Sequence, residues 1–292
     1  MKFSIINYSS SIFLQPLYLH NILINLENTE SIVVPNTENI FLVYDEFKPD
    51  YSIINAGGDL KNIILYNQGN RQVKHLINMD YLNMESVHKA ASYLKQSKKE
   101  NPLCCHLVFS TNKSHKEIDF GFPFVHIPNC ADGNIKKQPK SFDIDTAVII
   151  DKKDQKKKYK GSHHFISMMG FHDDSEPDIQ TSTMEFAKIA QNYKKIVFRD
   201  INHNCMSELF FNSLYFGNHV YFDSEDDNKI KDINESLSKV VKAEIDISYA
   251  NQQEYDIDTV KQALENKHMP KNRLKTLCSQ VSDLHNVGQT IQ

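Results

Sequence analysis

The segment between Lys194 and Asp223 constrains the fold more than any other part of the chain. Residues 196–198 and 220–222 are short apolar runs of the kind that form buried strands. Between them, apolar side chains at residues 209–216 recur at the spacing of one helical face, and Gly217 can supply the left-handed residue that often ends a helix. A strand, a helix and a second strand in this order predict a βαβ unit of a parallel sheet.

Polar side chains follow the first strand of this predicted unit and open its helix. Because ligands in parallel α/β sheets bind beyond the carboxyl ends of the strands, we expect these side chains to border a crevice. The helix would also present backbone N–H groups that have no partner within the helix, and such groups bind phosphate. The candidates are Arg199, Asp200, His203, Asn204, Ser207 and Glu208.

Four of these candidates could instead have an ordinary structural role. Arg199 can hold a diphosphate through paired hydrogen bonds, or it can form a surface ion pair with Asp200 or its neighbours. Asn204 and Ser207 can bind phosphate or simply cap the helix. Glu208 can bind ribose hydroxyls, with Asn212 one helical turn later sharing that role, or it can interact with the helix dipole.

The composition indicates a soluble globular protein. Hydrophobic residues make up 40% and charged residues 24% of the 292 residues. The net charge of −4 excludes a global basic field that would attract nucleic acid, although local basic patches remain open. Five cysteines without a CxxC pair indicate free thiols and no structural zinc site. No apolar run approaches the ~18 residues of a membrane span and no signal peptide is recognisable, so we expect a cytoplasmic protein, in the host cytoplasm if the chain is phage-encoded.

Strands and helices are predicted to alternate in both halves of the chain, which is typical of α/β proteins with parallel sheets. We expect two domains, residues 1–140 and 141–292, with the terminal helices in the second. One continuous sheet with an insertion is the alternative. Besides the unit described above, the predicted strands are 3–6, 32–34, 51–54, 63–66, 107–109, 124–127, 146–150 and 165–169, and the predicted helices are 16–26, 40–47, 84–96, 183–192, 230–241, 258–267 and one from residue 270.

Three further candidates lie at the ends of predicted strands. Gly170 and Phe171 follow one strand, where a glycine allows a close backbone approach to a ligand or makes an ordinary turn. Asp59 closes the sequence NAGGD after another strand, where it can act as a general base or belong to a turn.

The residues after the first strand, Tyr8, Ser9 and Ser10, occupy the position at which a doubly wound fold contacts its ligand. No GxGxxG pattern accompanies them, so dinucleotide binding is not predicted.

Two groups of charged residues have less specific patterns. The histidines and aspartates between residues 163 and 174 lack the spacing of a metal-ligand set, so no metal site is predicted and a weakly bound divalent ion stays open. The lysines between residues 152 and 160 form a solvated loop, or they contact DNA phosphates, above all through Lys156, Lys157 and Lys158.

The layout resembles the GT-B glycosyltransferases, which have two Rossmann-like domains facing a cleft. The sequence FKPD at residues 47–50 is similar to a signature of their N-terminal domain, and SELFFNSLYFGNHV at residues 207–220 is similar to their nucleotide-binding helix, turn and strand. The most similar members are short bacterial and phage transferases, including phage enzymes that glycosylate modified DNA bases. The family usually has a ribose-binding Glu five residues before the turn glycine, and this chain has Asn212 there.

The resemblance implies a glycosyltransferase that moves a sugar from a nucleoside-diphosphate sugar, with a UDP-sugar favoured, to an acceptor hydroxyl. A hydroxymethylated base in phage DNA is among the acceptors it implies. Helix-terminus amides and Arg199 would stabilise the leaving diphosphate without an obligatory metal, and Asp59 would deprotonate the acceptor. Tyr8, Ser9 and Ser10 would lie on the acceptor side. The implied donor-binding residues are Gly170, Phe171, Arg199, Asn204, Ser207, Glu208 and Asn212.

Two other functions remain open. The departure at Asn212 fits a module that binds a nucleotide-sugar without turning it over. A DNA-binding protein that uses residues 152–160 is the second alternative, and salt-sensitive binding indifferent to nucleotides would be its mark.

Overall fold

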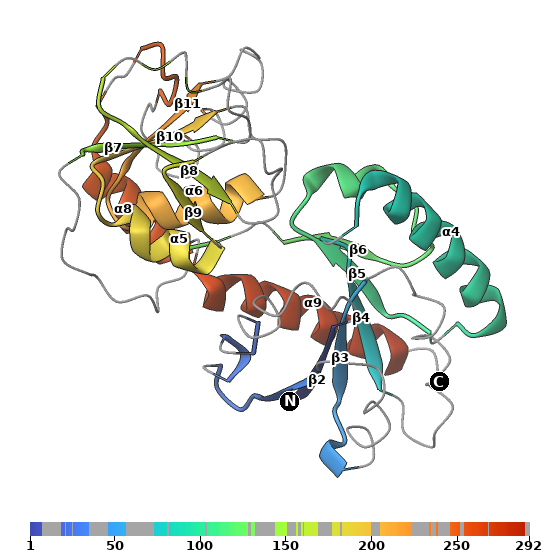
Figure 1. Ribbon diagram of the computed structural model, residues 1–292. Helices are drawn as coiled ribbons and strands as arrows, with labels where there is room; N and C mark the ends of the chain where they lie inside the picture. The colour runs from blue at the N-terminus through green and yellow to red at the C-terminus, as the bar shows by residue number, and fades with distance from the viewer. Residues whose placement is uncertain are drawn as a thin grey trace. The chain divides into compact units, whose positions relative to one another are not determined.

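The chain forms two units, each built on its own parallel sheet (Figure 1). The first unit comprises Met1–Pro128 and Lys271–Gln292, and the second comprises Asn129–Pro270. The predicted α/β class with parallel strands is therefore confirmed. The computed structural model describes residues 1–7, 19–20, 22–24, 26–34, 46–56, 73–80, 82–102, 104–127, 130–131, 144–150, 156, 159, 161–168, 177–181, 183–199, 205–223, 234, 238, 246–251, 254–267 and 269–289.

The first sheet has the strand order β2-β1-β3-β4-β5-β6, and all its described pairings are parallel. Its central strands are buried along almost their whole length, as expected of a parallel sheet covered on both faces. The predicted strand at residues 63–66 lies outside the described residues, as do most of the predicted helices 40–47 and 230–241. The strands are β1 (Lys2–Asn7), β2 (Glu30–Val34), β3 (Tyr51–Asn55), β4 (Lys74–Asn78), β5 (Leu107–Ser110) and β6 (Phe124–His126).

Helix α4 (Met84–Glu100) covers one face of the first sheet. Its Val87 and Leu94 are fully buried against a cluster that includes Ile77 and Val108. The side chain of Asn83 accepts a hydrogen bond from the Ser86 amide at 2.9 Å, which satisfies one of the free N–H groups at the helix start.

Helix α9 (Pro270–Gln289) covers the opposite face of the first sheet. Leu274 and Leu277 are buried with Ile53 and Leu76 of β3 and β4. The burial of these apolar side chains explains why the end of the chain belongs to the first unit, although we had expected the terminal helices in the second domain.

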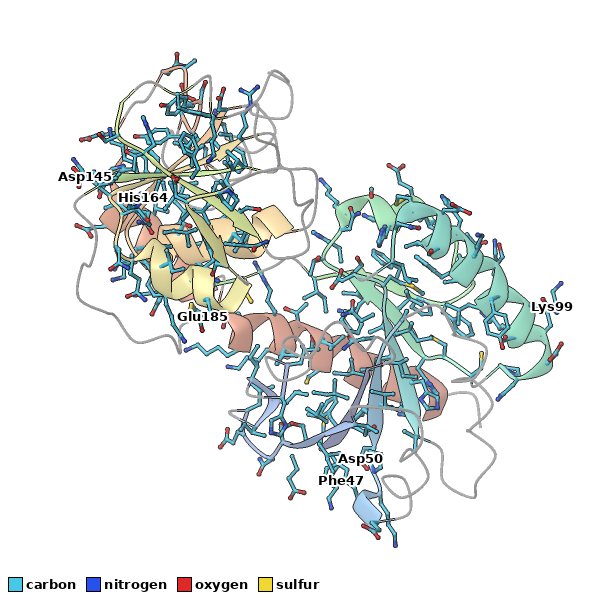
Figure 2. All side chains as sticks on the ribbon, viewed as in Figure 1. Phe47, Asp50, Lys99, Asp145, His164 and Glu185 are labelled. Atoms are coloured by element: carbon cyan, nitrogen blue, oxygen red, sulfur yellow. The ribbon has the colours of Figure 1, made fainter. Side chains whose placement is uncertain are left out.

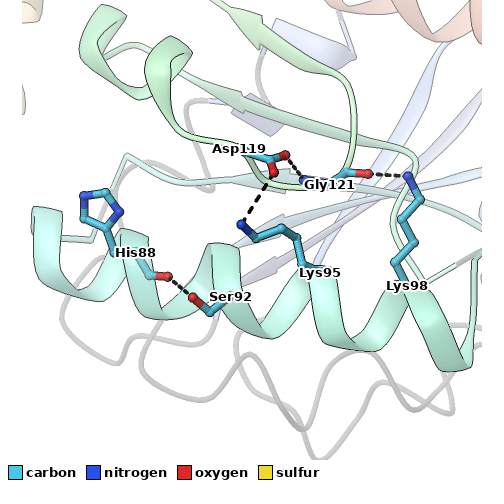
Figure 3. A network of polar contacts seen from close by, with 6 residues as sticks. All are labelled: His88, Ser92, Lys95, Lys98, Asp119 and Gly121. Atoms are coloured by element: carbon cyan, nitrogen blue, oxygen red, sulfur yellow. Dashed lines mark hydrogen bonds and ion pairs between the residues drawn. The ribbon is translucent and has the colours of Figure 1, made fainter.

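A polar network holds the segment before β6 against α4 (Figure 3). Asp119 accepts a hydrogen bond from the Gly121 amide at 2.9 Å and lies 3.5 Å from the ammonium nitrogen of Lys95. Lys98 donates to the carbonyl oxygen of Gly121. Gly121 has a φ of +75°, and a Cβ at this position would lie 2.9 Å from Cγ of Lys95, so both conformation and space require glycine.

The residues that resemble an N-domain signature join β1 to the start of β3. Asp50, labelled in Figure 2, accepts a hydrogen bond from the Lys2 amide through Oδ2, and its own amide donates to the Lys2 carbonyl; both bonds are 2.9 Å long. The Lys2 ammonium group also lies 5.3 Å from the ring centroid of Phe47. These contacts give residues 47–50 a structural role at the amino-terminal end of the sheet.

The second sheet has the strand order β11-β10-β7-β8-β9, again with parallel pairings throughout. Helices α5 (Thr183–Ala190), α6 (Cys205–Tyr215) and α8 (Ile257–Lys267) contribute to a common core on one face of this sheet. The strands are β7 (Thr146–Ile149), β8 (His164–Met168), β9 (Ile179–Thr181), β10 (Lys195–Arg199) and β11 (His219–Asp223).

The predicted βαβ unit is present as β10, α6 and β11 (Figure 1). Helix α6 ends where predicted: the Gly217 amide donates to Leu214 and the Asn218 amide donates to Ser213, each at 3.0 Å. This is the Schellman pattern, in which the residue after the helix is left-handed, and Gly217 has a φ of +83°. The turn returns the chain into β11 with Val220 and Phe222 facing the same core as Leu209 and Leu214.

Candidate functional site

Three polar side chains meet at the carboxyl ends of β10 and β11 in the second unit. Arg199 donates from Nη1 to Oδ2 of Asp223 at 2.8 Å, and the Tyr159 hydroxyl donates to the same oxygen at 2.6 Å. The side chains of Arg199 and Asp223 are only 14% and 9% exposed. We had considered a surface ion pair of Arg199 with Asp200 or its neighbours, but the ion pair that the structure shows is buried, and its partner is Asp223, the last residue of the neighbouring strand.

Burial and mutual attraction fix the charge states of this cluster. Burial raises the pKa of the Tyr159 hydroxyl, and the hydrogen bond to Asp223 raises it further, so the phenol remains a donor. Burial alone would lower the pKa of Arg199, but the hydrogen bond and charge of Asp223 outweigh it and the pKa is raised. The cluster thus keeps a protonated Arg199 at the sheet edge.

An aromatic layer surrounds Tyr159 on the face of the second sheet opposite the helices. Tyr159 packs in a cluster with Val148, Val197 and Tyr221, and its ring centroid lies 5.7 Å from that of Tyr249. Residues 197 and 221 alternate with the helix-facing residues of β10 and β11, so Arg199 and Asp223 belong to this same face. The carboxyl edge therefore combines an apolar floor with a few charged groups, which is typical of ligand sites.

Helix α6 begins six residues after β10 ends and carries three of the predicted donor-binding residues. Ser207 and Glu208 lie in the first turn of the helix. Asn212 lies in its body and is only 1% exposed, so its side chain is part of the protein interior. Among the expected donor-binding residues, the structure thus brings Arg199 and the start of α6 to the same end of the sheet.

The remaining predicted site residues fall outside the part of the chain that the structure describes. They are Tyr8, Ser9, Ser10, Asp59, Gly170, Phe171, Asp200, His203, Asn204, Lys157 and Lys158. Lys156 is described, and its ammonium group lies 5.2 Å from the ring centroid of Phe165 on β8. The predicted strand that precedes Gly170 is present as β8.

A second polar cluster, not predicted from the sequence, lies at the carboxyl ends of β3, β4 and β5 in the first unit. Asn78 Nδ2 donates to Asn55 Oδ1 at 3.1 Å, and both side chains are buried. The Asp80 amide donates to Asn78 Oδ1 at 3.2 Å. Oδ1 of Asp80 in turn accepts hydrogen bonds from Ser110 and Thr111 at the end of β5.

One sequence signal could have revealed this cluster. Asn78 and Ser110 directly follow apolar residues of a strand, and Asp80 and Thr111 come one or two residues after the ends of these strands. Polar residues at the carboxyl ends of adjacent parallel strands meet at one edge, but β4 was not predicted and the pairing was therefore not seen.

No metal site or membrane span emerges from the described residues. Across those ranges, no group of three or more His, Cys, Asp or Glu side chains could hold a metal ion. Within the same part of the chain, no helix is both long and apolar enough to cross a bilayer.

The comparisons with known proteins found chains similar to this one only among solved structures. No family model and no curated protein sequence matches the chain. Spinosyn forosaminyltransferase SpnP is similar with a TM-score of 0.46 and 9% sequence identity, over 96% of this chain and 99% of that one. CalG4, the calicheamicin glycosyltransferase, is similar with a TM-score of 0.43 and 10% identity, over 97% of this chain and 98% of that one.

Proposed function

We propose that the chain transfers a sugar from a nucleoside-diphosphate sugar to an acceptor hydroxyl. The observation that carries this proposal is the β10–α6–β11 unit, in which an 11-residue helix starts at the carboxyl edge of a parallel sheet close in sequence to a buried, protonated arginine. A helix start at that edge offers N–H groups to a diphosphate. The resemblance of residues 207–220 to a nucleotide-sugar-binding segment gives the same assignment.

In the proposed reaction the second unit holds the donor. Backbone amides at the start of α6 bind the diphosphate, and Arg199, at the same carboxyl end of the sheet, strengthens the positive field in which the leaving group develops its charge. Asp223 and Tyr159 hold the guanidinium in place. Glu208, in the first turn of α6, binds the ribose hydroxyls, with Gly170, Phe171, Asn204 and Ser207 completing the donor site. The buried position of Asn212 favours Glu208 for this role.

The acceptor is a hydroxyl group that loses its proton to a carboxylate of the first unit. Asp59 is the carboxylate that the sequence indicates, and Tyr8, Ser9 and Ser10 are proposed to contact the acceptor. A UDP-sugar is the favoured donor, and a hydroxymethylated DNA base is the acceptor that we propose to test first. The reason is that Lys156, Lys157 and Lys158 form a basic run able to contact phosphates.

Turnover of nucleotide-sugars tests the proposal. The protein is incubated with UDP-, GDP-, ADP- and dTDP-sugars, with and without magnesium, and with a panel of hydroxyl acceptors that includes duplex DNA containing 5-hydroxymethylcytosine. Release of the nucleoside diphosphate and mass gain of the acceptor are both measured. The proposal predicts acceptor-dependent release with at least one donor, and failure of every donor and acceptor contradicts it.

Two variants make the assay specific to the donor site. Glu208→Gln is expected to weaken donor binding, because an amide replaces a carboxylate that accepts two ribose hydrogen bonds. Glu265→Gln, which changes an exposed glutamate of α8 in the same unit, is the matched control and should leave turnover unchanged. Equal turnover of Glu208→Gln and wild type would remove Glu208 from the site.

Salt dependence separates the acceptor proposal from simple DNA binding. If Lys156, Lys157 and Lys158 contact phosphates, replacing all three by alanine should lower the slope of log K against log salt by up to about 3, at ~0.9 for each contact. Binding that keeps its slope, or that occurs without any transfer to the DNA, contradicts the DNA acceptor.

A further inference from the structure

The carboxylate of Asp80 is held on one side alone. Its Oδ1 accepts hydrogen bonds from the Ser110 hydroxyl at 2.8 Å, the Thr111 amide at 2.6 Å and the Thr111 hydroxyl at 3.0 Å. Across the described residues, no hydrogen bond or ion pair engages Oδ2. Asp80 therefore has one oxygen held by three hydrogen bonds, while none of the described donors binds the other.

The surrounding side chains hold Asp80 rigidly. Asn55 and Asn78 fix the preceding turn from the ends of β3 and β4, and both are at most 3% exposed. Ser110 is fully buried, and its Oγ also accepts a hydrogen bond from the Asn112 amide at 3.0 Å. The carbonyl of Thr111 lies 3.1 Å from His126 Nε2. A group held by side chains on the ends of parallel strands is well placed for chemistry.

No ion pair with Asp80 forms within the described part of the chain, although the charge of His115 acts to lower the pKa of Asp80. Burial raises the pKa of Asp80, although the hydrogen bonds from Thr111 and Ser110 act in the opposite direction. The nearby His115 is 1% exposed, and burial lowers its pKa, an effect that the charge of Asp80 partly opposes. His126 behaves in the same way. A carboxylate that is oriented but not neutralised by a cation is more basic than an ion-paired one.

We propose that Asp80 is the general base that accepts the proton of the acceptor hydroxyl, with Ser110 and Thr111 as its positioning residues. This proposal rests on the function proposed above and assigns its base to Asp80 instead of Asp59. The proton moves from the hydroxyl to Oδ2 of Asp80. The acceptor oxygen forms a bond to the anomeric carbon of the sugar, and the bond from that carbon to the diphosphate oxygen breaks with its electron pair leaving on the nucleoside diphosphate.

Acceptors that differ in ionisation state test whether Asp80 acts as a base or only supports the structure. Asp80→Asn keeps the size of the side chain but cannot accept the proton. With an aliphatic alcohol as acceptor, kcat is expected to fall by about 100-fold to 10,000-fold, while donor binding is unchanged. With 4-nitrophenol, which is largely ionised at mildly alkaline pH, no base is needed and the variant should retain most of the wild-type rate. An equal loss with both acceptors, or no loss with either, overturns the proposal.

Parallel variants distinguish Asp80 from two other aspartates of the first unit. Asp59→Asn should reduce alcohol transfer much less than Asp80→Asn, and the reverse result assigns the base to Asp59. Asp119→Asn, at an exposed carboxylate of the same unit, is the control for loss of a negative charge. A wild-type protein that binds donors and transfers sugar while Asp80→Asn remains active refutes the role of Asp80 alone. A wild-type protein inactive with every donor refutes the proposed function and this base together.

Ser110→Ala keeps the experiment decisive if Asp80→Asn does not fold. This variant retains the carboxylate but removes one hydrogen bond to it, which should raise the pKa of Asp80. The acidic limb of kcat/KM with an alcohol acceptor should then move to higher pH, while the profile with ionised 4-nitrophenol should not move. His115 and His126 are unchanged in the variant, so a limb that stays in place overturns the assignment to Asp80.

Discussion

Arg199 Nη1 lies 2.8 Å from Oδ2 of Asp223 and donates a hydrogen bond to it, which joins the carboxyl ends of two neighbouring parallel strands. The hydroxyl of Tyr159 donates to the same oxygen at 2.6 Å. Asp223 thus compensates a cation that burial alone would disfavour, and it leaves the guanidinium fixed at the edge where the donor is proposed to bind.

Removing the carboxylate of Asp223 should be strongly destabilising. Asp223→Ala leaves a mostly buried guanidinium without its partner, and breaking such a pair costs about 3–5 kcal/mol. Tyr159→Phe removes only a hydrogen bond to the carboxylate and should cost about 1.5–3 kcal/mol. Urea-induced unfolding measures both changes.

The exposed ion pair of Lys188 and Glu185 provides the control for this comparison. Its side chains are 42% and 56% exposed, so Glu185→Ala should change the free energy of unfolding by about 1 kcal/mol or less. If Asp223→Ala proves as mild as Glu185→Ala, the buried pair does not contribute as described.

Gly217 and Gly121 should respond differently to alanine, although both have left-handed backbones. A Cβ at Gly217 meets nothing within 4 Å, so Gly217→Ala should cost only the conformational penalty of roughly 1–2 kcal/mol. At Gly121 the added Cβ would also approach Lys95, and the cost should be larger. Thermal unfolding gives the order, and Gly217→Asn should recover part of the loss because asparagine tolerates this conformation. Equal costs at the two glycines would contradict the role of Lys95.

His75 should make the protein less stable in mild acid. The side chain is 1% exposed, and burial, with a smaller contribution from His106, lowers its pKa to about 4. Folded protein therefore resists protonation that the unfolded chain accepts. The contribution of neutral His75 to the free energy of unfolding is fully present above the unfolded pKa of about 6.5. It is lost as pH falls towards about 4, by up to ~3 kcal/mol.

The pH dependence of unfolding in His75→Gln checks this prediction. The variant has no imidazole at this position, so its free energy of unfolding should vary less between neutral and mildly acidic pH than that of the wild type. His88→Gln, at an exposed position of α4, should keep the wild-type slope. A slope in His75→Gln that matches the wild type would show that the protonation of another group governs acid sensitivity.

The βαβ unit was predicted correctly because the signals for its strands, helix and turn lie close together in the sequence. The apolar runs of β10 and β11, the helical spacing in α6 and the stop at Gly217 all lie within 29 residues, and each has its own physical signature. Strand β4 was missed for the opposite reason. Its sequence KHLIN contains a histidine and an asparagine, and both are buried by long-range packing and polar contacts that the local sequence does not reveal.

The contacts within the two polar clusters could not be predicted for the same reason, because their residues lie far apart in the sequence. Arg199 was predicted to be a site residue, but its partner Asp223 lies 24 residues later and could be paired with it only through the register of two strands. Asp80 and its donors Ser110 and Thr111 are about 30 residues apart and required β4 and β5 to be placed side by side. The proposed base at Asp80 therefore followed from sheet topology, whereas Asp59 had been chosen because it follows two glycines at the end of a predicted strand.

Binding of a nucleoside diphosphate is the most direct test of the account. Thermal or urea unfolding of the full chain is followed with increasing UDP, GDP, ADP and dTDP, for the wild type, Glu208→Gln and Glu265→Gln. We expect at least one nucleotide to stabilise the wild type, by ~2.7 kcal/mol at about 100 times its Kd. Glu208→Gln should weaken this effect, and Glu265→Gln should not. Unchanged stability with every nucleoside diphosphate at millimolar concentration would contradict the proposed donor site.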